Sequence, residues 1–145
     1  MSRSFSSIGL FVRFMSQRVT TLPAAQKRAL DAASQVVLEE ARCLPGTYQA
    51  GWPALDPETI AHKATGDSPL VETGGMRTSY GRKVVSAMKA AVGSNDPRAM
   101  WQELGTARGV PPRPVLKAAA IRKEGEVHRI IGHHLVAHIA GRSNR

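Results

Sequence analysis

Apolar residues recur at helical spacing along the first third of the chain. The stretch from about Pro23 to Leu44 keeps its charged and amide side chains off one helix face, which carries Leu30, Ala33, Val37, Ala41 and Leu44. Pro23 suits the first turn of a helix, because an N–H group at that position has no intrahelical partner. Pro45-Gly46 then ends the element. The pattern therefore predicts a long helix that begins at Pro23.

The same spacing returns near the end of the chain, from Pro114 to about Ala140. One face of this second predicted helix holds Leu116, Ala120, Val127, Ile130, Ile131, Leu135 and Ile139. Gly125 and Gly132 lie inside the stretch and lower its helix propensity. We expect a long C-terminal helix that packs by this face.

Two short helices are marked soon after the first long one. Asp56 and Pro57 combine a capping side chain with a proline suited to the first helical position, so they predict a helix that ends by Gly66. Thr73 offers a second cap, in front of a turn or two over residues 74–80.

The period then changes to that of a strand. Arg82–Ser86 and Lys89–Gly93 predict a small antiparallel hairpin, because they carry the β-branched residues Val84, Val85 and Val92. A turn follows and begins a helix over Pro97–Leu104, and Gly105–Arg113 is an extended loop rich in glycine and proline. The order of elements predicts one α+β domain over residues 1–145, with a long N-terminal helix, short helices, a hairpin and a long C-terminal helix.

Composition agrees with one globular domain and adds a charge asymmetry. The chain has 145 residues, of which 42% are hydrophobic and 21% charged, and its formal net charge is +9. Residues 1–72 hold seven basic and seven acidic side chains, whereas residues 73–145 hold thirteen and four. The excess charge therefore belongs to the second half, which predicts an acidic or polyanionic neighbour.

The N-terminal residues are basic and admit two interpretations. Arg3, Arg13 and Arg18 precede the first acidic residue, Asp31, as in a mitochondrial transit peptide. The alternative is an arm over residues 1–20 that is flexible or becomes ordered on assembly. The longest uncharged apolar stretch near the end, residues 130–141, is shorter than the roughly 20 residues that a membrane span needs.

Residues with catalytic or metal-binding chemistry are sparse. A single cysteine, Cys43, excludes an internal disulfide, and we expect it to be a small buried side chain near a helix end. His134 and His138 share a helix face, and His128 and His133 lie nearby, but the pair lacks a third ligand and a nearby carboxylate base. We therefore expect partly exposed or interface histidines on an amphipathic helix, no metal, no cofactor and no enzymatic activity. A metal-dependent enzyme is the weakest of three hypotheses.

A nucleic-acid-binding protein is the stronger rival hypothesis. Basic residues of the second half predict a face toward DNA or an acidic protein ring: Arg77, Arg82, Lys83, Lys89, Arg98 and Arg108. Only Tyr80 and Trp101 are interleaved with them, which is too few for a stacking platform. A small basic nucleic-acid-binding protein therefore stays as the alternative function.

Four segments in a fixed order resemble one family. Ser68–Ser79 (SPLVETGGMRTS) is similar to "PLvdTG.LR.S", and Val92–Asn95 (VGSN) to a "vGsn" strand end. Met100–Thr106 (MWQELGT) with Pro111–Leu116 (PPRPVL) is similar to "y..(h/q)E.GT…pPRPfl", and Trp52–Lys63 to "W.pL...Ti..K". These are segments of bacteriophage tail completion (virion morphogenesis) proteins, and together they cover roughly residues 50–118.

The resemblance implies a structural virion protein that forms a ring in the phage neck, where the tail joins the DNA-filled head. A closed ring needs heterologous faces, and the resemblance favours a hexamer. Its expected partners are copies of itself and adjacent neck, connector or tail-tube rings, with non-specific contact to packaged DNA left open. No membrane partner is expected, and the location is the virion, after synthesis in the host cytoplasm. Tail completion, tail terminator and other neck rings stay undistinguished.

The resemblance also implies two sets of residues. The residues expected to maintain the fold are Leu70, Thr73, Gly74, Met76, Gly93, Ser94 and Asn95. The candidates for subunit contact are Trp101, Glu103, Gly105, Thr106, Pro111, Pro112, Arg113, Pro114 and Leu116. Glu103 and Arg113 flank the loop, and we expect them to hold it as an ion pair.

Overall fold

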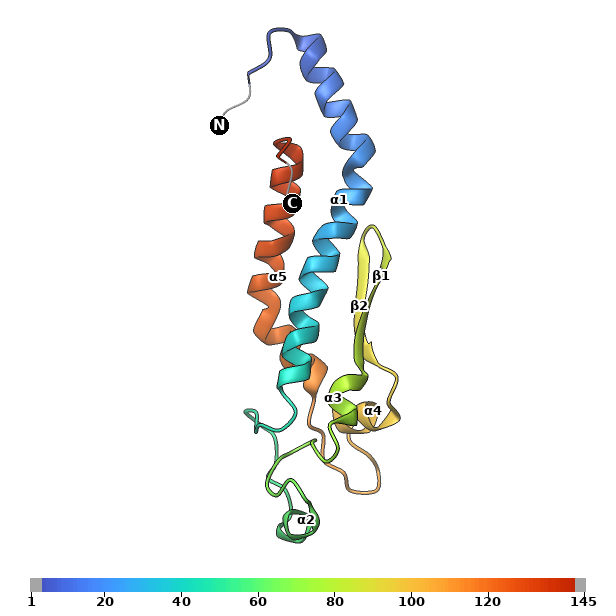
Figure 1. Cartoon of the computed structure of the whole chain (residues 1–145), viewed down its shortest axis with the longest axis vertical. Helices are drawn as coiled ribbons and strands as arrows, with labels where there is room; N and C mark the ends of the chain where they lie inside the picture. Colours follow the sequence, from blue (N-terminus) through green and yellow to red (C-terminus); the bar gives the residue numbers. More distant parts are fainter. Residues whose placement is uncertain (1–3, 143–145) are drawn as a thin grey trace.

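The computed structural model describes residues 4–142 and contains the expected kinds of element (Figure 1). In this part of the chain the elements are α1 (Ile8–Cys43), α2 (Pro57–His62), α3 (Gly75–Ser79), β1 (Tyr80–Ser86), β2 (Lys89–Ser94), α4 (Pro97–Leu104) and α5 (Val115–Ile139). The predicted α+β class, the hairpin and the helix over Pro97–Leu104 are therefore confirmed.

Helices α1 and α5 run antiparallel and side by side, and the hairpin lies along α1 (Figure 1). Small residues line the contact, because Ala25, Ala29 and Ala33 of α1 and Ala119 and Ala137 of α5 are all buried. Alanine side chains let two helix backbones approach closely, so the pair forms the spine of an elongated molecule.

The start of α1 differs from the prediction. The helix begins at Ile8 rather than Pro23, after Ser7, whose hydroxyl accepts a hydrogen bond from the Leu10 N–H at 3.3 Å. Pro23 lies inside the helix, where it supplies no N–H to the preceding turn. The expected arm is thus helical from Ile8 onward, and the first turns of α1 project past the end of α5 (Figure 1).

The core lies where the end of α1 meets α3, β1, α4 and the beginning of α5. Its largest side chains are those of Trp52, Met76, Tyr80, Leu38 and Leu44. Tyr80, at the start of β1, is paired with Ser94 of β2, and the Arg42 guanidinium of α1 donates two hydrogen bonds to the Tyr80 carbonyl, at 2.7 and 3.2 Å. This cluster fixes the short elements that carry the family-like segments.

The face of α5 that packs inward is also shifted from the prediction. Val115, Ala119, Ala137 and His138 are buried, whereas Ala120 and Ile139, expected on the buried face, are exposed. The helix is continuous through both of its glycines. Cys43, expected to be buried, is exposed at the end of α1.

Candidate subunit-contact surface

Glu103, at the end of α4, holds the beginning of α5. Its carboxylate accepts hydrogen bonds from the backbone N–H groups of Val115, Leu116 and Lys117, at 2.8, 2.9 and 2.9 Å. The first N–H groups of a helix have no intrahelical acceptor. The side chain of Pro114, at the cap position, has no atom that could accept a hydrogen bond from them. A carboxylate also interacts favourably with the positive end of the helix dipole. Glu103 therefore caps α5 from another helix.

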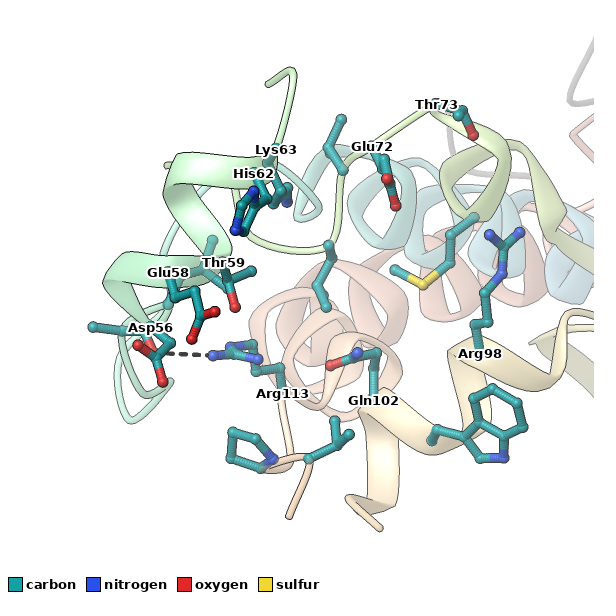
Figure 2. A pocket seen from close by; sticks show the side chains of 18 of the residues that line it. Asp56, Glu58, Thr59, His62, Lys63, Glu72, Thr73, Arg98, Gln102 and Arg113 are labelled. Carbon is teal, nitrogen blue, oxygen red and sulfur yellow. Dashed lines mark hydrogen bonds between the residues drawn. The ribbon is translucent and has the colours of Figure 1, made fainter. Parts of the chain in front are cut away.

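Arg113 is buried and binds the segment in front of α2. Its guanidinium donates to the carbonyl oxygens of Pro53, at 3.0 and 3.2 Å, and Ala54, at 3.1 Å. Figure 2 shows the guanidinium reaching toward this segment. The prediction of a Glu103–Arg113 ion pair is wrong, because Glu103 binds backbone N–H groups of α5 and Arg113 binds backbone carbonyls in front of α2. The two residues still hold both ends of the loop, as separate anchors.

The loop between these anchors closes tightly on itself. Gly105 has a φ of 75°, and a Cβ atom there would lie 3.0 Å from the Val110 carbonyl oxygen and 3.2 Å from Pro112. The Thr106 N–H donates to that same oxygen at 3.0 Å, and the Thr106 hydroxyl accepts from the Val110 N–H at 3.3 Å. Gly105 and Thr106 thus shape the loop from within.

The subunit-contact candidates therefore divide by exposure. Trp101 is 48% exposed and Pro112 is exposed, whereas Arg113 is buried. The partly buried candidates are Glu103, Gly105, Thr106, Pro111, Pro114 and Leu116. Met100 and Leu104, which the sequence analysis did not select, are 57% and 74% exposed on α4 beside Trp101. A signal was available, because Leu104 is four residues after Met100 and three after Trp101, a spacing that places the three apolar side chains on one helix face.

An open groove of about 1280 Å³ lies between α2, α4 and this loop (Figure 2). Carboxylates of Asp56, Glu58 and Glu72 and cations of Lys63, Arg98 and Arg113 line it together, with Leu70 and Met76 between them. The Gln102 side-chain oxygen is buried and has no hydrogen-bond donor in the described part of the chain. Mixed charge and an unpaired acceptor suit a polar peptide segment better than a single ion.

The fold-signature residues surround the same region. Met76 is buried and Leu70 packs against the core with a φ of 63°, while Gly74 precedes α3 with a φ of 80°. The Thr73 hydroxyl accepts weakly from the Gly75 N–H at 3.4 Å. At the end of β2, the Ser94 hydroxyl is hydrogen-bonded to the Ser79 hydroxyl at 2.6 Å and accepts from the Asp96 N–H at 3.0 Å, with Gly93 and Asn95 on either side.

The six basic candidates do not act as one set. Arg77 donates to the Pro45 carbonyl oxygen at 2.6 Å, Arg82 pairs with Asp31, and Arg98 pairs with Asp96 at 2.7 Å. The exposed side chains of Lys83, Lys89 and Arg108 have no ion-pair partner among residues 4–142. Three of the six residues predicted for the basic face therefore bind groups of the same chain.

The histidines lie along α5. His138 is buried, and its Nε2 lies 3.0 Å from the Arg18 carbonyl oxygen of α1. Among the described residues, histidine, cysteine and carboxylate side chains form no group of three able to hold a metal ion. Within the same range, neither long helix is apolar enough to cross a bilayer.

Comparison of the chain with protein-family models, with curated proteins and with solved structures gave no match.

Proposed function

We propose that this chain is a structural virion protein of a tailed phage, which assembles with copies of itself into a ring in the neck and joins the tail to the DNA-filled head. The observation that carries the proposal is the accessible surface of the single chain, which is larger than a compact monomer of its mass exposes. The ordered resemblance over roughly residues 50–118 supplies the setting.

The accessible surface of the chain is 9669 Å². A compact monomer of 15.6 kDa exposes about 7,250 Å² by the usual scaling with mass, so the excess is roughly 2,400 Å². A ring subunit has two interfaces, and a standard interface buries about 800 Å² of each partner. Two such interfaces would cover about 1,600 Å² per subunit. The excess is thus sufficient for both faces.

Besides α4, two further faces carry exposed apolar side chains, one on α1 and one on α5. On the N-terminal part of α1, Ile8, Val12, Met15, Val19 and Leu22 recur at the alternating four- and three-residue spacing of a helix-pairing seam, and Met15 and Leu22 are half-buried. Ile8, Val12 and Val19 are 81%, 55% and 67% exposed.

The second face is the outer side of α5. Ile121, Val136 and Ile139 there are 64%, 65% and 51% exposed. Two different apolar faces on one chain favour a heterologous contact, in which one face of each copy meets the other face of the next. Heterologous contacts that close by rotation produce a ring, and the sequence resemblance favours six copies.

The test is assembly in solution, followed by analytical ultracentrifugation and negative-stain images. We expect the full chain to form a ring-sized species, and we expect Val12→Ser with Val19→Ser to shift it toward the monomer. The matched control is Val85→Ser with Met88→Ser, which removes exposed apolar side chains from the hairpin and leaves assembly unchanged.

A monomer at all accessible concentrations that binds DNA at nanomolar, salt-resistant affinity would contradict the proposal and favour the nucleic-acid-binding alternative. The neck location has its own test in the neighbouring reading frames. Portal, capsid and tail-tube genes beside this one are the expected result, and a neighbourhood without virion genes would count against it.

A further inference from the structure

A second pocket, of about 610 Å³, lies between α1 and α5 near the end of α5. Its polar lining comes from Arg18, Thr21 and Arg28 of α1, from His134 and His138 of α5, and from Arg142. The pocket is separate from the groove beside α2 and from the loop that holds the subunit-contact candidates.

The charges in this pocket have one sign. Three guanidinium groups and two imidazoles line it, and none of the lining residues in the described part of the chain is a carboxylate. Elsewhere the guanidinium groups of Arg82, Arg98 and Arg122 each have a carboxylate partner. The side chains of Arg28 and Arg142 have no ion pair within residues 4–142. Like charges brought together repel unless an anion lies between them.

Arg18 supplies an independent observation. Its Nε atom is buried and has no hydrogen-bond acceptor in the described part of the chain, while its guanidinium carbon lies 4.8 Å from the centroid of the Phe14 ring. A buried cationic donor without an acceptor is unfavourable, and natural structures leave few of them unsatisfied. Because the buried Nε cannot be reached from the pocket, an anion there would bind the Arg18 guanidinium through its Nη atoms.

The buried imidazole beside it is already oriented. The Nε2 atom of His138 donates to the Arg18 carbonyl oxygen at 3.0 Å and lies 3.5 Å from the Thr21 hydroxyl oxygen. These contacts tie the last turns of α5 to the turn of α1 that carries Arg18. The two helices therefore hold the cationic groups as a fixed arrangement rather than as independent surface side chains.

We propose that this pocket binds a phosphate group, either as a free phosphate or as part of a nucleic-acid strand. Guanidinium groups suit the oxygens of phosphate because they can donate two parallel hydrogen bonds to one anion. The site draws Arg18 and Arg28 from the half of the chain that is neutral in sequence, and none of its arginines belongs to the six residues predicted for DNA contact. The proposal is argued from the pocket of the single chain and does not depend on ring assembly.

The test measures binding to the full chain by isothermal titration calorimetry, with inorganic phosphate, pyrophosphate and a short single-stranded oligonucleotide as probes. The variant is Arg28→Gln with Arg142→Gln, two exposed positions. The control is Lys83→Gln with Lys89→Gln, which lowers the net charge equally on the exposed hairpin. Loss of charge-assisted hydrogen bonds predicts roughly tenfold weaker binding, or more, in the pocket variant alone. Arg28→Gln by itself serves if the double variant fails to fold.

Each outcome decides the matter. Selective loss of phosphate or pyrophosphate binding supports the site with a free anion as ligand, and selective loss of oligonucleotide binding alone supports it with a nucleic-acid phosphate. Equal weakening in the pocket and control variants overturns the proposal, since net charge would then explain the binding. A wild-type chain that binds none of the three probes overturns it as well.

Discussion

Replacing Glu103 with alanine removes the acceptor for three N–H groups at the beginning of α5. Val115 is fully buried, so its N–H would lose its acceptor without gaining water, at about 1–3 kcal/mol. The other two N–H groups can turn to water, and the lost interaction of the carboxylate with the helix dipole adds about 0.3–1 kcal/mol. We expect Glu103→Ala to lower the free energy of unfolding by about 3 kcal/mol.

The assay is thermal and urea unfolding followed by circular dichroism, with every variant at one protein concentration because assembly shifts the midpoint. A chain of 145 residues with an unfolding entropy of about 2.1 cal/mol/K per residue should lose about 10 °C in Tm. Glu103→Gln keeps one acceptor oxygen and should lose about half as much. The control is Glu124→Ala, an exposed position on α5 that should stay within about 0.5 kcal/mol of the wild type. A Glu103→Ala variant that unfolds within 1 kcal/mol of this control refutes the capping role.

Three further predictions concern the core, the loop and an ion pair. Burial raises the pKa of Tyr80 to about 12, and its hydroxyl has no partner within residues 4–142. Tyr80→Phe should therefore raise stability by about 1 kcal/mol at neutral pH. It should also remove the part of the loss above about pH 10 that ionisation of Tyr80 causes, so its advantage over wild type in urea midpoints should be larger at pH 11 than at pH 7. Gly105→Ala should cost at least about 1 kcal/mol in thermal unfolding because of its positive φ and close backbone contact, while Gly125→Ala, in the open on α5, should add about 0.5–1 kcal/mol. The hydrogen bond from Arg82 holds the pKa of Asp31 below its ordinary value of 3.8, so the pair stabilises the fold above that pH and this contribution disappears as the pH falls through the lowered value. Arg82→Gln should therefore reduce the loss of stability at acid pH, seen in urea midpoints measured from pH 2 to 7. An unchanged loss in this variant would contradict the assignment.

The short elements could be predicted from the sequence because their boundaries are set locally. Asp96 accepts from the Arg98 N–H at 2.9 Å and Pro97 takes the first helical position, so the signals for α4 lie within three residues. Asp56 and Pro57 mark α2 in the same way, although the Asp56 side chain makes no capping hydrogen bond. The hairpin follows from its β-branched residues in the same local manner.

The start of α1 could not be predicted from Pro23, because the same residue fits a first turn and, at a cost, a helix interior. The hydroxyls of Thr20 and Thr21 donate to the carbonyls of Ser16 and Gln17, so this turn of the helix has side-chain hydrogen bonds close to the position where Pro23 lacks an N–H. A signal for the true start was present in Ser7, followed by the alternating spacing of apolar residues from Ile8.

The partners of Glu103 and Arg113 could not be predicted from the sequence, because both side chains bind backbone groups. Nearly every residue carries such groups, so the residue types do not indicate which of them will be bound. One clue existed for Glu103. A helix that begins after Pro114 has no capping side chain of its own, and Glu103 is the nearest acidic residue before it. The partner of Arg113 lies some 60 positions away in sequence, at Pro53, and only the folded chain brings the two together.

The division of charge between the two halves of the sequence has a meaning in the fold that the net value hides. The surplus bases of the second half meet acids of the first: Arg82 pairs with Asp31, and Arg122 and Lys123 lie 3.1 and 3.9 Å from the carboxylate of Glu40. Folding therefore neutralises part of the basic half on α1. Asp31 and Glu40 of α1 are engaged in these ion pairs. The part of α1 before Asp31 contains Arg18 and Arg28 but no acidic residue, so its positive charge is not balanced from within the helix. Within residues 4–142, cations without an ion-pair partner therefore come together at the α1–α5 pocket, and an anionic ligand should be sought there first.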